Sequence, residues 1–174
     1  MHDELLQRGR QVKLAVFDVD GVLTDGRLYF LEDGSEIKTF STLDGQGIKM
    51  LINAGVATAI ITGRSSPMVQ RRAKSLGIAH LYQGREDKLA VLDELLAQLG
   101  LSYAEVAYLG DDLPDLAPIR RVALGMAVAN ATAFVKEHAA GVTQARGGEG
   151  AAREFCELIL RAQGNLDAAL AAYL

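Results

Sequence analysis

Two carboxylates follow directly on an apolar run near the start of the chain. Asp18 and Asp20 come after residues 14–17, Leu-Ala-Val-Phe, and precede Gly21. In open α/β sheets ligands bind beyond the carboxyl ends of the strands, and hard divalent cations prefer carboxylate oxygens. Two aspartates at such a place, followed by a turn glycine, therefore indicate a site for a metal ion and a phosphate group.

Later apolar runs end in further polar groups, namely Thr62 with Gly63, then Lys88 near the start of a helix, then the cluster Asp111, Asp112 and Asp115. A parallel sheet would gather these side chains at one edge. The set suits phosphoryl transfer, because a phosphate dianion repels a carboxylate nucleophile until a divalent cation and a lysine neutralise the charge.

Each residue then has an expected role. Asp18 and Asp111, with the backbone carbonyl of Asp20, would bind Mg²⁺. Asp18 would attack phosphorus and form an aspartyl phosphate that water later hydrolyses. Asp20 would protonate the leaving alcohol and afterwards deprotonate the attacking water. Lys88 would supply fixed positive charge, and the Thr62 hydroxyl would hold a phosphoryl oxygen.

The same residues also fit a calcium loop or purely structural roles. A calcium loop starting at Asp18 would need oxygen ligands at its fifth and twelfth positions, which are Val22 and Tyr29, so a calcium loop is excluded. Taken singly, the remaining groups fit a turn, a helix cap, a solvated helix residue or a charged first turn. Their combination, in this order and at strand ends, favours catalysis.

Composition bounds the class of protein. The length of 174 residues is that of one domain, so we expect residues 1–174 to form a single domain. The single cysteine, Cys156, lies on an apolar helical stripe and excludes an internal disulfide. The net charge of −4, with dispersed Lys and Arg, gives no reason to expect nucleic acid as a partner. Without a long apolar run or a secretion signal, we expect no membrane association and a cytoplasmic protein.

Strand and helix patterns alternate along the chain. Strands are predicted over residues 14–17, 56–61, 79–82, 106–109, 122–126 and 141–143, and helices over 48–54, 67–76, 88–99, 132–137 and 151–163. This alternation predicts an α/β fold, a Rossmann-like parallel sheet with helices on both faces. Residues 26–40 instead predict a small β-hairpin around Asp33-Gly34. Residues 28–31 of its first arm are all apolar, so we expect a partner subunit to cover it.

The chain resembles the haloacid dehalogenase superfamily of phosphohydrolases, whose four motifs are all present: DVDGVLTD at 18–25, ITGR at 61–64, Lys88, and GDDLPD at 110–115. In that family the second aspartate of the first motif, here Asp20, marks phosphatases and phosphotransferases. Most members insert a cap domain where this chain has only the hairpin. The resemblance therefore implies the capless branch of the HAD-like fold.

Within that branch the segments STLDGQGIK, ITGRSS, HLYQG, VAYLGDDLPD and RGGEGAAREFCELIL resemble the 3-deoxy-D-manno-octulosonate 8-phosphate phosphatases of lipopolysaccharide sugar synthesis. The resemblance implies a homotetramer whose central hairpins close the neighbouring active sites, and a mobile C-terminal segment over about 145–174 that carries Arg146. It also implies a sugar acid phosphate substrate bound by Asp20, Ser41, Thr42, Leu43, Asp44, Gly45, Lys49, Gly63, Arg64, Arg72 and Lys88.

Three alternatives remain open. A sibling phosphatase would act on a nine-carbon sugar acid 9-phosphate, although Arg64 and Ser75 resemble the octulosonate enzymes more closely. A phospho-accepting receiver module also uses an acidic cluster, a hydroxyl and a lysine, but its phosphorylated aspartate follows the third strand. A catalytically idle oligomerisation domain would not need all four motifs.

Overall fold

Six parallel strands form the centre of the protein, whose computed structural model describes residues 2–174. The strand order is β5–β4–β1–β6–β7–β8, and every neighbouring pair is parallel. The bounds are β1 Leu14–Phe17, β4 Ala57–Ile61, β5 His80–Tyr82, β6 Val106–Gly110, β7 Leu124–Ala127 and β8 Gly141–Val142. The predicted α/β sheet of Rossmann type is therefore confirmed.

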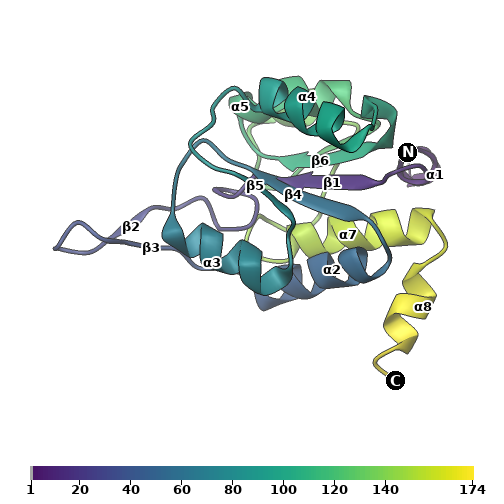
Figure 1. Ribbon diagram of the computed structural model, residues 1–174, viewed down its shortest axis with the longest axis horizontal. Helices are drawn as coiled ribbons and strands as arrows, with labels where there is room; N and C mark the ends of the chain where they lie inside the picture. The colour runs from purple at the N-terminus through teal and green to yellow at the C-terminus, as the bar shows by residue number, and fades with distance from the viewer. Residues whose placement is uncertain (1) are drawn as a thin grey trace.

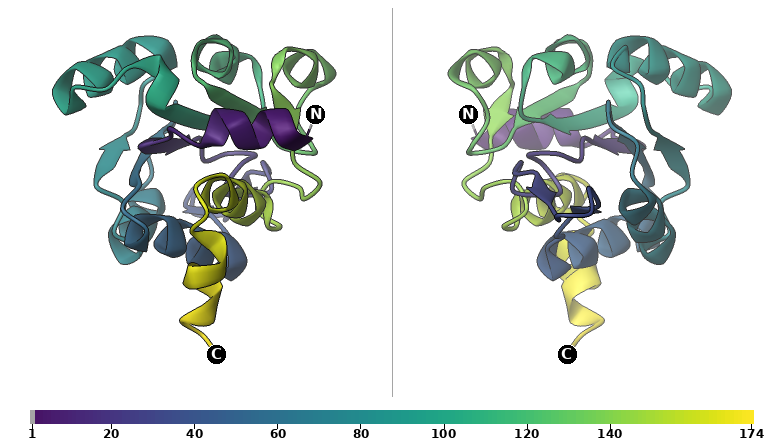
Figure 2. Two further views of the ribbon diagram at one scale, coloured as in Figure 1. Left: turned by 90° about the vertical axis from the view of Figure 1, so that its right-hand side faces the viewer. Right: turned by 90° about the vertical axis from the view of Figure 1, so that its left-hand side faces the viewer.

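Helices cover both faces of this sheet (Figure 1). On one face lie α4 (Lys88–Leu99), α5 (Leu113–Arg121) and α6 (Ala133–His138), and on the other lie α2 (Thr42–Asn53), α3 (Pro67–Leu76) and α7 (Ala151–Ala162). Helix α1 (His2–Gly9) packs beside α7, and α8 (Leu166–Ala171) extends away from the body towards the C-terminus (Figure 2). Within residues 2–174 no helix combines the length and apolar character that crossing a membrane requires.

The register of the central strands sets the position of the polar residues. All four residues of β1 are buried, as is every residue of β6, because helices cover both faces. Phe17, the last residue of β1, lies beside Ile60 of β4 and Leu109 of β6. The residues that follow these three strands therefore emerge at one edge of the sheet.

Helix α2 begins at Thr42, earlier than the predicted start at residue 48. The Ser41 hydroxyl caps it by accepting the backbone N–H of Asp44 at 3.4 Å. Glycines disfavour a helix interior, but here Gly47 lets α7 approach closely, since a Cβ on Gly47 would lie 2.9 Å from the Arg153 Cα. Packing between α2 and α7 thus outweighs the local preference that the sequence shows.

The hairpin projects from the layered body (Figure 1). Strands β2 (Tyr29–Phe30) and β3 (Glu36–Ile37) pair antiparallel, as predicted. Phe30 is 64% exposed, and its apolar neighbours Leu28, Tyr29 and Leu31 are also exposed. Within a single chain the apolar arm thus faces solvent.

Candidate active site

Four charged side chains meet at the carboxyl edge of the sheet. Asp18 follows β1, Asp111 follows β6, Asp115 lies in the first turn of α5, and Lys88 is the first residue of α4. The Lys88 Nζ lies 2.9 Å from Asp18 Oδ2 and 2.7 Å from Asp115 Oδ1, and its side chain is buried. Carboxylate oxygens of the three aspartates lie within 4.8 Å of one another. Two buried carboxylates and the half-buried carboxylate of Asp111 thus gather around one ammonium group.

Asp115 is the positioning member of this cluster. Its Oδ1 accepts hydrogen bonds from Lys88 Nζ and from the buried Tyr108 hydroxyl, each at 2.7 Å. Its Oδ2 accepts the backbone N–H of Asp111 at 3.0 Å. Since both oxygens of Asp115 are already engaged, Asp18 and Asp111 are the carboxylates with coordination capacity left for a metal ion.

The electrostatics of the cluster also suit a cation. Burial, then the negative charge of Asp115, raises the pKa of Asp18 to about 7, against the opposing charge of Lys88. Burial, followed by the charges of Asp115 and Asp18, raises the pKa of Asp111 to about 8. The excess negative charge and the all-oxygen donor set fit a hard divalent cation bound by Asp18 and Asp111.

The cluster opens into a cleft of about 410 Å³ that other predicted residues join. Thr62 and Gly63 line it immediately beyond β4, and Asp20 and Arg64 stand at its mouth. The Thr62 backbone N–H donates to the Tyr82 carbonyl at 2.9 Å, which ties the end of β4 to β5. The predicted catalytic residues Asp18, Asp20, Thr62 and Lys88 therefore share one cleft with Asp111.

A segment more than a hundred residues later in the sequence packs against the loop that carries Asp18 and Asp20. Asn130 accepts the Gly147 N–H at 2.6 Å and donates to the Gly21 carbonyl at 3.3 Å. The Gly148 N–H donates to the Val22 carbonyl at 2.9 Å. A Cβ on Gly147 would lie 1.7 Å from the Gly21 carbonyl oxygen, so glycine permits this approach. The Gly-rich link expected to be mobile thus packs here against the loop that carries Asp18 and Asp20; its mobility stays a prediction.

The remaining predicted substrate-binding residues do not line this cleft: Ser41 caps α2, Thr42, Leu43, Asp44, Gly45 and Lys49 belong to α2, and Arg72 belongs to α3. Asp44 is buried, and its Oδ1 accepts the Arg153 N–H at 2.9 Å near the start of α7. The Arg72 guanidinium donates to the Ser41 carbonyl at 2.9 Å, and a Cβ on Gly45 would lie 2.3 Å from that guanidinium. The other three, Thr42, Leu43 and Lys49, are exposed. Within one chain these residues do not join Asp18, and their part in substrate binding stays a prediction.

Sequence reasoning did not single out two residues that contact the site. Lys38, just after β3, pairs with Asp20, and Asn130 donates to the Gly21 carbonyl in the loop after β1. Lys38 lies in a hairpin whose polar residues look solvated, and Asn130 follows a strand without a recognisable motif. Only tertiary structure brings them to the loop after β1.

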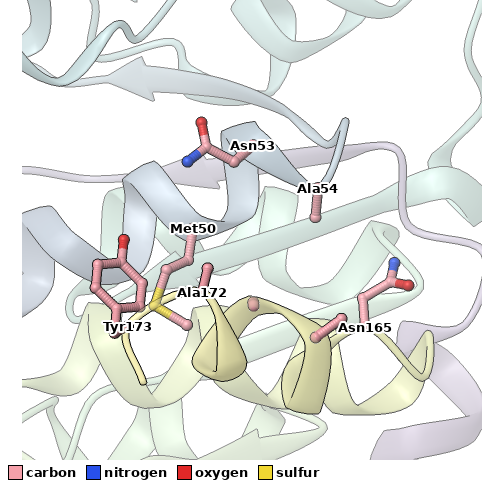
Figure 3. Close-up of a pocket in the computed structure, with 8 residues that line it drawn as sticks. Met50, Asn53, Ala54, Asn165, Ala172 and Tyr173 are labelled. Atoms are coloured by element: carbon pink, nitrogen blue, oxygen red, sulfur yellow. The ribbon is translucent and has the colours of Figure 1, made fainter.

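A second hollow lies away from the carboxylates, between α2 and α8 (Figure 3). It measures about 340 Å³, and apolar and amide side chains with the Tyr173 phenol line it. Gln46 donates to the Tyr173 hydroxyl. Nothing in its lining resembles the charged cluster, so we assign it no chemistry.

Known proteins resemble this chain along nearly its whole length. Residues 78–155 match the model of the haloacid dehalogenase-like hydrolase family. The 3-deoxy-D-manno-octulosonate 8-phosphate phosphatase of Yersinia pestis is 46% identical over 167 residues, 96% of this chain and 89% of that protein.

Solved structures of similar proteins also match this chain over nearly its whole length. A probable YrbI-family phosphatase of Pseudomonas syringae is 76% identical with a TM-score of 0.98, covering 98% of this chain and 97% of that one. The 3-deoxy-D-manno-octulosonate 8-phosphate phosphatase of Moraxella catarrhalis, solved with magnesium, phosphate and KDO, is 45% identical with a TM-score of 0.97, covering 99% of each chain.

Proposed function

The chain belongs to the 3-deoxy-D-manno-octulosonate 8-phosphate phosphatase family of haloacid dehalogenase-like hydrolases, and on that premise we propose that it hydrolyses 3-deoxy-D-manno-octulosonate 8-phosphate to the free sugar acid and phosphate. The observation that carries the proposal is the shared cleft of Asp18, Asp20, Lys88 and Asp111. Membership of the family makes the chain a phosphoric monoester hydrolase; the substrate, the route through an aspartyl phosphate and the place in lipopolysaccharide sugar synthesis are our proposal.

Mg²⁺ is the proposed cofactor, and Asp18, Asp111 and the Asp20 carbonyl would hold it. When bound, it supplies the positive charge that screens a phosphate dianion from a carboxylate. The surplus of carboxylates over ammonium groups in the cluster supports this assignment. The Moraxella catarrhalis relative, solved with a magnesium ion, supports it independently.

Each side chain of the cleft has its own role in the proposed reaction. The Asp18 carboxylate attacks phosphorus, and the resulting aspartyl phosphate is hydrolysed by water. Asp20 protonates the leaving alcohol and later takes a proton from that water. Lys88 lies 2.9 Å from Asp18, where its charge offsets the repulsion between nucleophile and substrate. Thr62, buried beside the cluster, holds a phosphoryl oxygen.

A substrate panel with Mg²⁺ tests the proposal. We expect kcat/KM for the octulosonate 8-phosphate to exceed that for a nine-carbon sugar acid 9-phosphate and for p-nitrophenyl phosphate. Arg64, a cation at the mouth of the cleft, supports an acidic substrate. Preference for the nine-carbon ester would assign the protein to the sibling activity, and no hydrolysis of any ester would refute a phosphatase.

We propose further that the protein is a cytoplasmic homotetramer with its hairpins at the centre. The exposed apolar arm at residues 28–31 supports this assembly, because an apolar surface of this kind is typical of an interface. Equilibrium sedimentation of the purified protein tests it. A stable, active monomer would refute the assembly but leave the proposed reaction intact.

A further inference from the structure

Four charged side chains form an alternating ring, and two of them, Asp20 and Arg64, also line the cleft. The Lys38 Nζ pairs with Asp20 Oδ1 and lies 3.2 Å from Glu36 Oε1. The Arg64 Nη2 lies 2.8 Å from Glu36 Oε2, and the Arg64 Nε lies 3.8 Å from Asp20 Oδ2. Each cation therefore lies between the two carboxylates, and each carboxylate between the two cations.

Lys38 is the buried member of this ring. Its side chain is 3% exposed, against 22% for Asp20, 16% for Glu36 and 44% for Arg64. Burying an ammonium group is costly unless it is paired and hydrogen-bonded. Lys38 is thus held by its two carboxylate partners and is not a solvated residue of the hairpin surface.

The ring connects the hairpin to the catalytic loop. Glu36 belongs to β3 and Lys38 follows it directly, whereas Asp20 follows β1. The other hairpin strand makes its own connection, since the Tyr29 hydroxyl donates to Asp25 Oδ2 at 2.6 Å. Tyr29 of β2 and Lys38, the residue after β3, are therefore both bonded to the loop that follows β1.

We propose that Lys38 is a positioning residue that holds the Asp20 carboxylate in place for proton transfer, which makes the hairpin part of the active site. The inference rests on the proposed phosphatase function. By binding Oδ1, Lys38 fixes the rotation of the carboxylate and leaves Oδ2 as the oxygen that exchanges the proton. If Lys38 is removed, Arg64 is the only cation of the ring that remains beside Asp20. Its side chain is longer and more exposed than that of Lys38, so it would hold the Asp20 carboxylate less firmly.

The proposed role predicts a loss that depends on the leaving group. In the first step the bond from Asp18 to phosphorus forms, the ester P–O bond breaks, and the ester oxygen takes the proton of Asp20. A sugar alkoxide is strongly basic and needs that proton, whereas p-nitrophenolate leaves readily without it. Misplacing Asp20 should therefore slow release of the sugar and scarcely affect release of p-nitrophenolate.

Single-turnover release with Mg²⁺ and excess enzyme measures this step for both substrates. For Lys38→Met we expect release of the sugar acid to slow by about 10-fold or more, a part of the ~10²–10⁴-fold that general acid catalysis provides. Release of p-nitrophenolate should slow by less than about 3-fold, since its departure does not need the acid. Lys38→Gln, which keeps an N–H donor, should lie between Lys38→Met and wild type on the sugar substrate.

Lys13→Met is the matched control, because it removes another lysine that pairs with a carboxylate, Glu105 at 2.7 Å, far from the cleft. It should leave both rates unchanged. Melting temperatures show whether each variant folds. If Lys38→Met does not fold, the comparison of the two substrates is made with Lys38→Gln.

The outcomes separate the inference from the proposed function. Equal loss on both substrates would make Lys38 a structural residue or a phosphate ligand and overturn the inference. A raised KM for the sugar ester, with its single-turnover rate unchanged, would make Lys38 a substrate ligand and overturn it too. If the wild-type protein hydrolyses neither ester, the proposed function fails and the inference fails with it.

Discussion

Removing divalent cations should make the stability of this protein fall as pH rises. Burial and neighbouring charge raise the pKa of Asp18 from 3.8 to about 7 and that of Asp111 to about 8. Because both folded-state values lie above the unfolded ones, the native state keeps protons that the unfolded chain releases. The free energy of unfolding therefore decreases with pH until both groups are ionised.

The magnitude follows from the shift of Asp18 alone. One pKa unit corresponds to about 1.4 kcal/mol. Between pH 5 and pH 7 the unfolded chain releases the Asp18 proton that the folded protein largely keeps, so the free energy of unfolding falls by about 2 kcal/mol. For a chain of this length that loss lowers the melting temperature by about 4 to 8 °C. Carboxyls with a lowered pKa, such as Asp25, Asp87 and Glu105, lose their contribution only at lower pH, outside this window.

Thermal melting in EDTA at pH 5, 6, 7 and 8, repeated with Mg²⁺, measures the effect. Mg²⁺ should raise the melting temperature more at pH 8 than at pH 5, because protons compete for its ligands. Asp111→Asn should flatten the dependence and abolish the response to Mg²⁺, whereas the exposed control Asp167→Asn should behave as wild type. A metal-free melting temperature that is equal or higher at pH 8 would refute the reasoning.

Three further predictions concern activity, packing and assembly. Asp18→Asn should abolish turnover but leave a folded protein, with a higher metal-free melting temperature at pH 8; normal turnover would exclude Asp18 as the nucleophile. Gly147→Ala should destabilise by about 1–3 kcal/mol, since its Cβ meets the Gly21 carbonyl; an unchanged melting temperature and kcat would contradict that. Phe30→Lys should dissociate the tetramer in sedimentation, and an intact tetramer would place the interface elsewhere.

The sheet and the catalytic cluster could be predicted from sequence because both depend on strong local signals. An uninterrupted apolar run such as residues 14–17 suits a strand that is covered on both faces. Once the strands are parallel, their carboxyl ends share an edge, so Asp18 and Asp111 had to lie near each other. The predicted sheet is confirmed, and the structure brings Asp18 and Asp111 together; the catalytic roles of these residues stay a prediction.

The start of α2 and the partners of Asp44 and Asp20 could not be predicted in this way. Gly45 and Gly47 lie close together in the sequence, which indicates a loop. In the structure both belong to α2, because the missing side chain of Gly47 lets α7 pack closely against this helix. The position of Asp44 in the sequence suggests a ligand-binding residue or a cap for its own helix. In the structure its carboxylate instead accepts a backbone N–H of α7. Asp44 and Arg153 are 109 residues apart and Asp20 and Lys38 are 18 apart, so neither contact belongs to one helix or turn, and neither leaves a local pattern in the sequence.

The acidic cluster places unbalanced charge within the core, and this links the site to the stability of the rest of the fold. The single ammonium group of Lys88 cannot neutralise the carboxylates of Asp18, Asp111 and Asp115, so once Asp18 and Asp111 are ionised the cluster opposes folding unless a cation is bound. The surrounding apolar layers, with β1 and β6 wholly buried, must offset that cost. A cation that binds only the folded cluster recovers part of it, so the affinity for the cation and the stability of the fold should change together when either Asp18 or Asp111 is replaced.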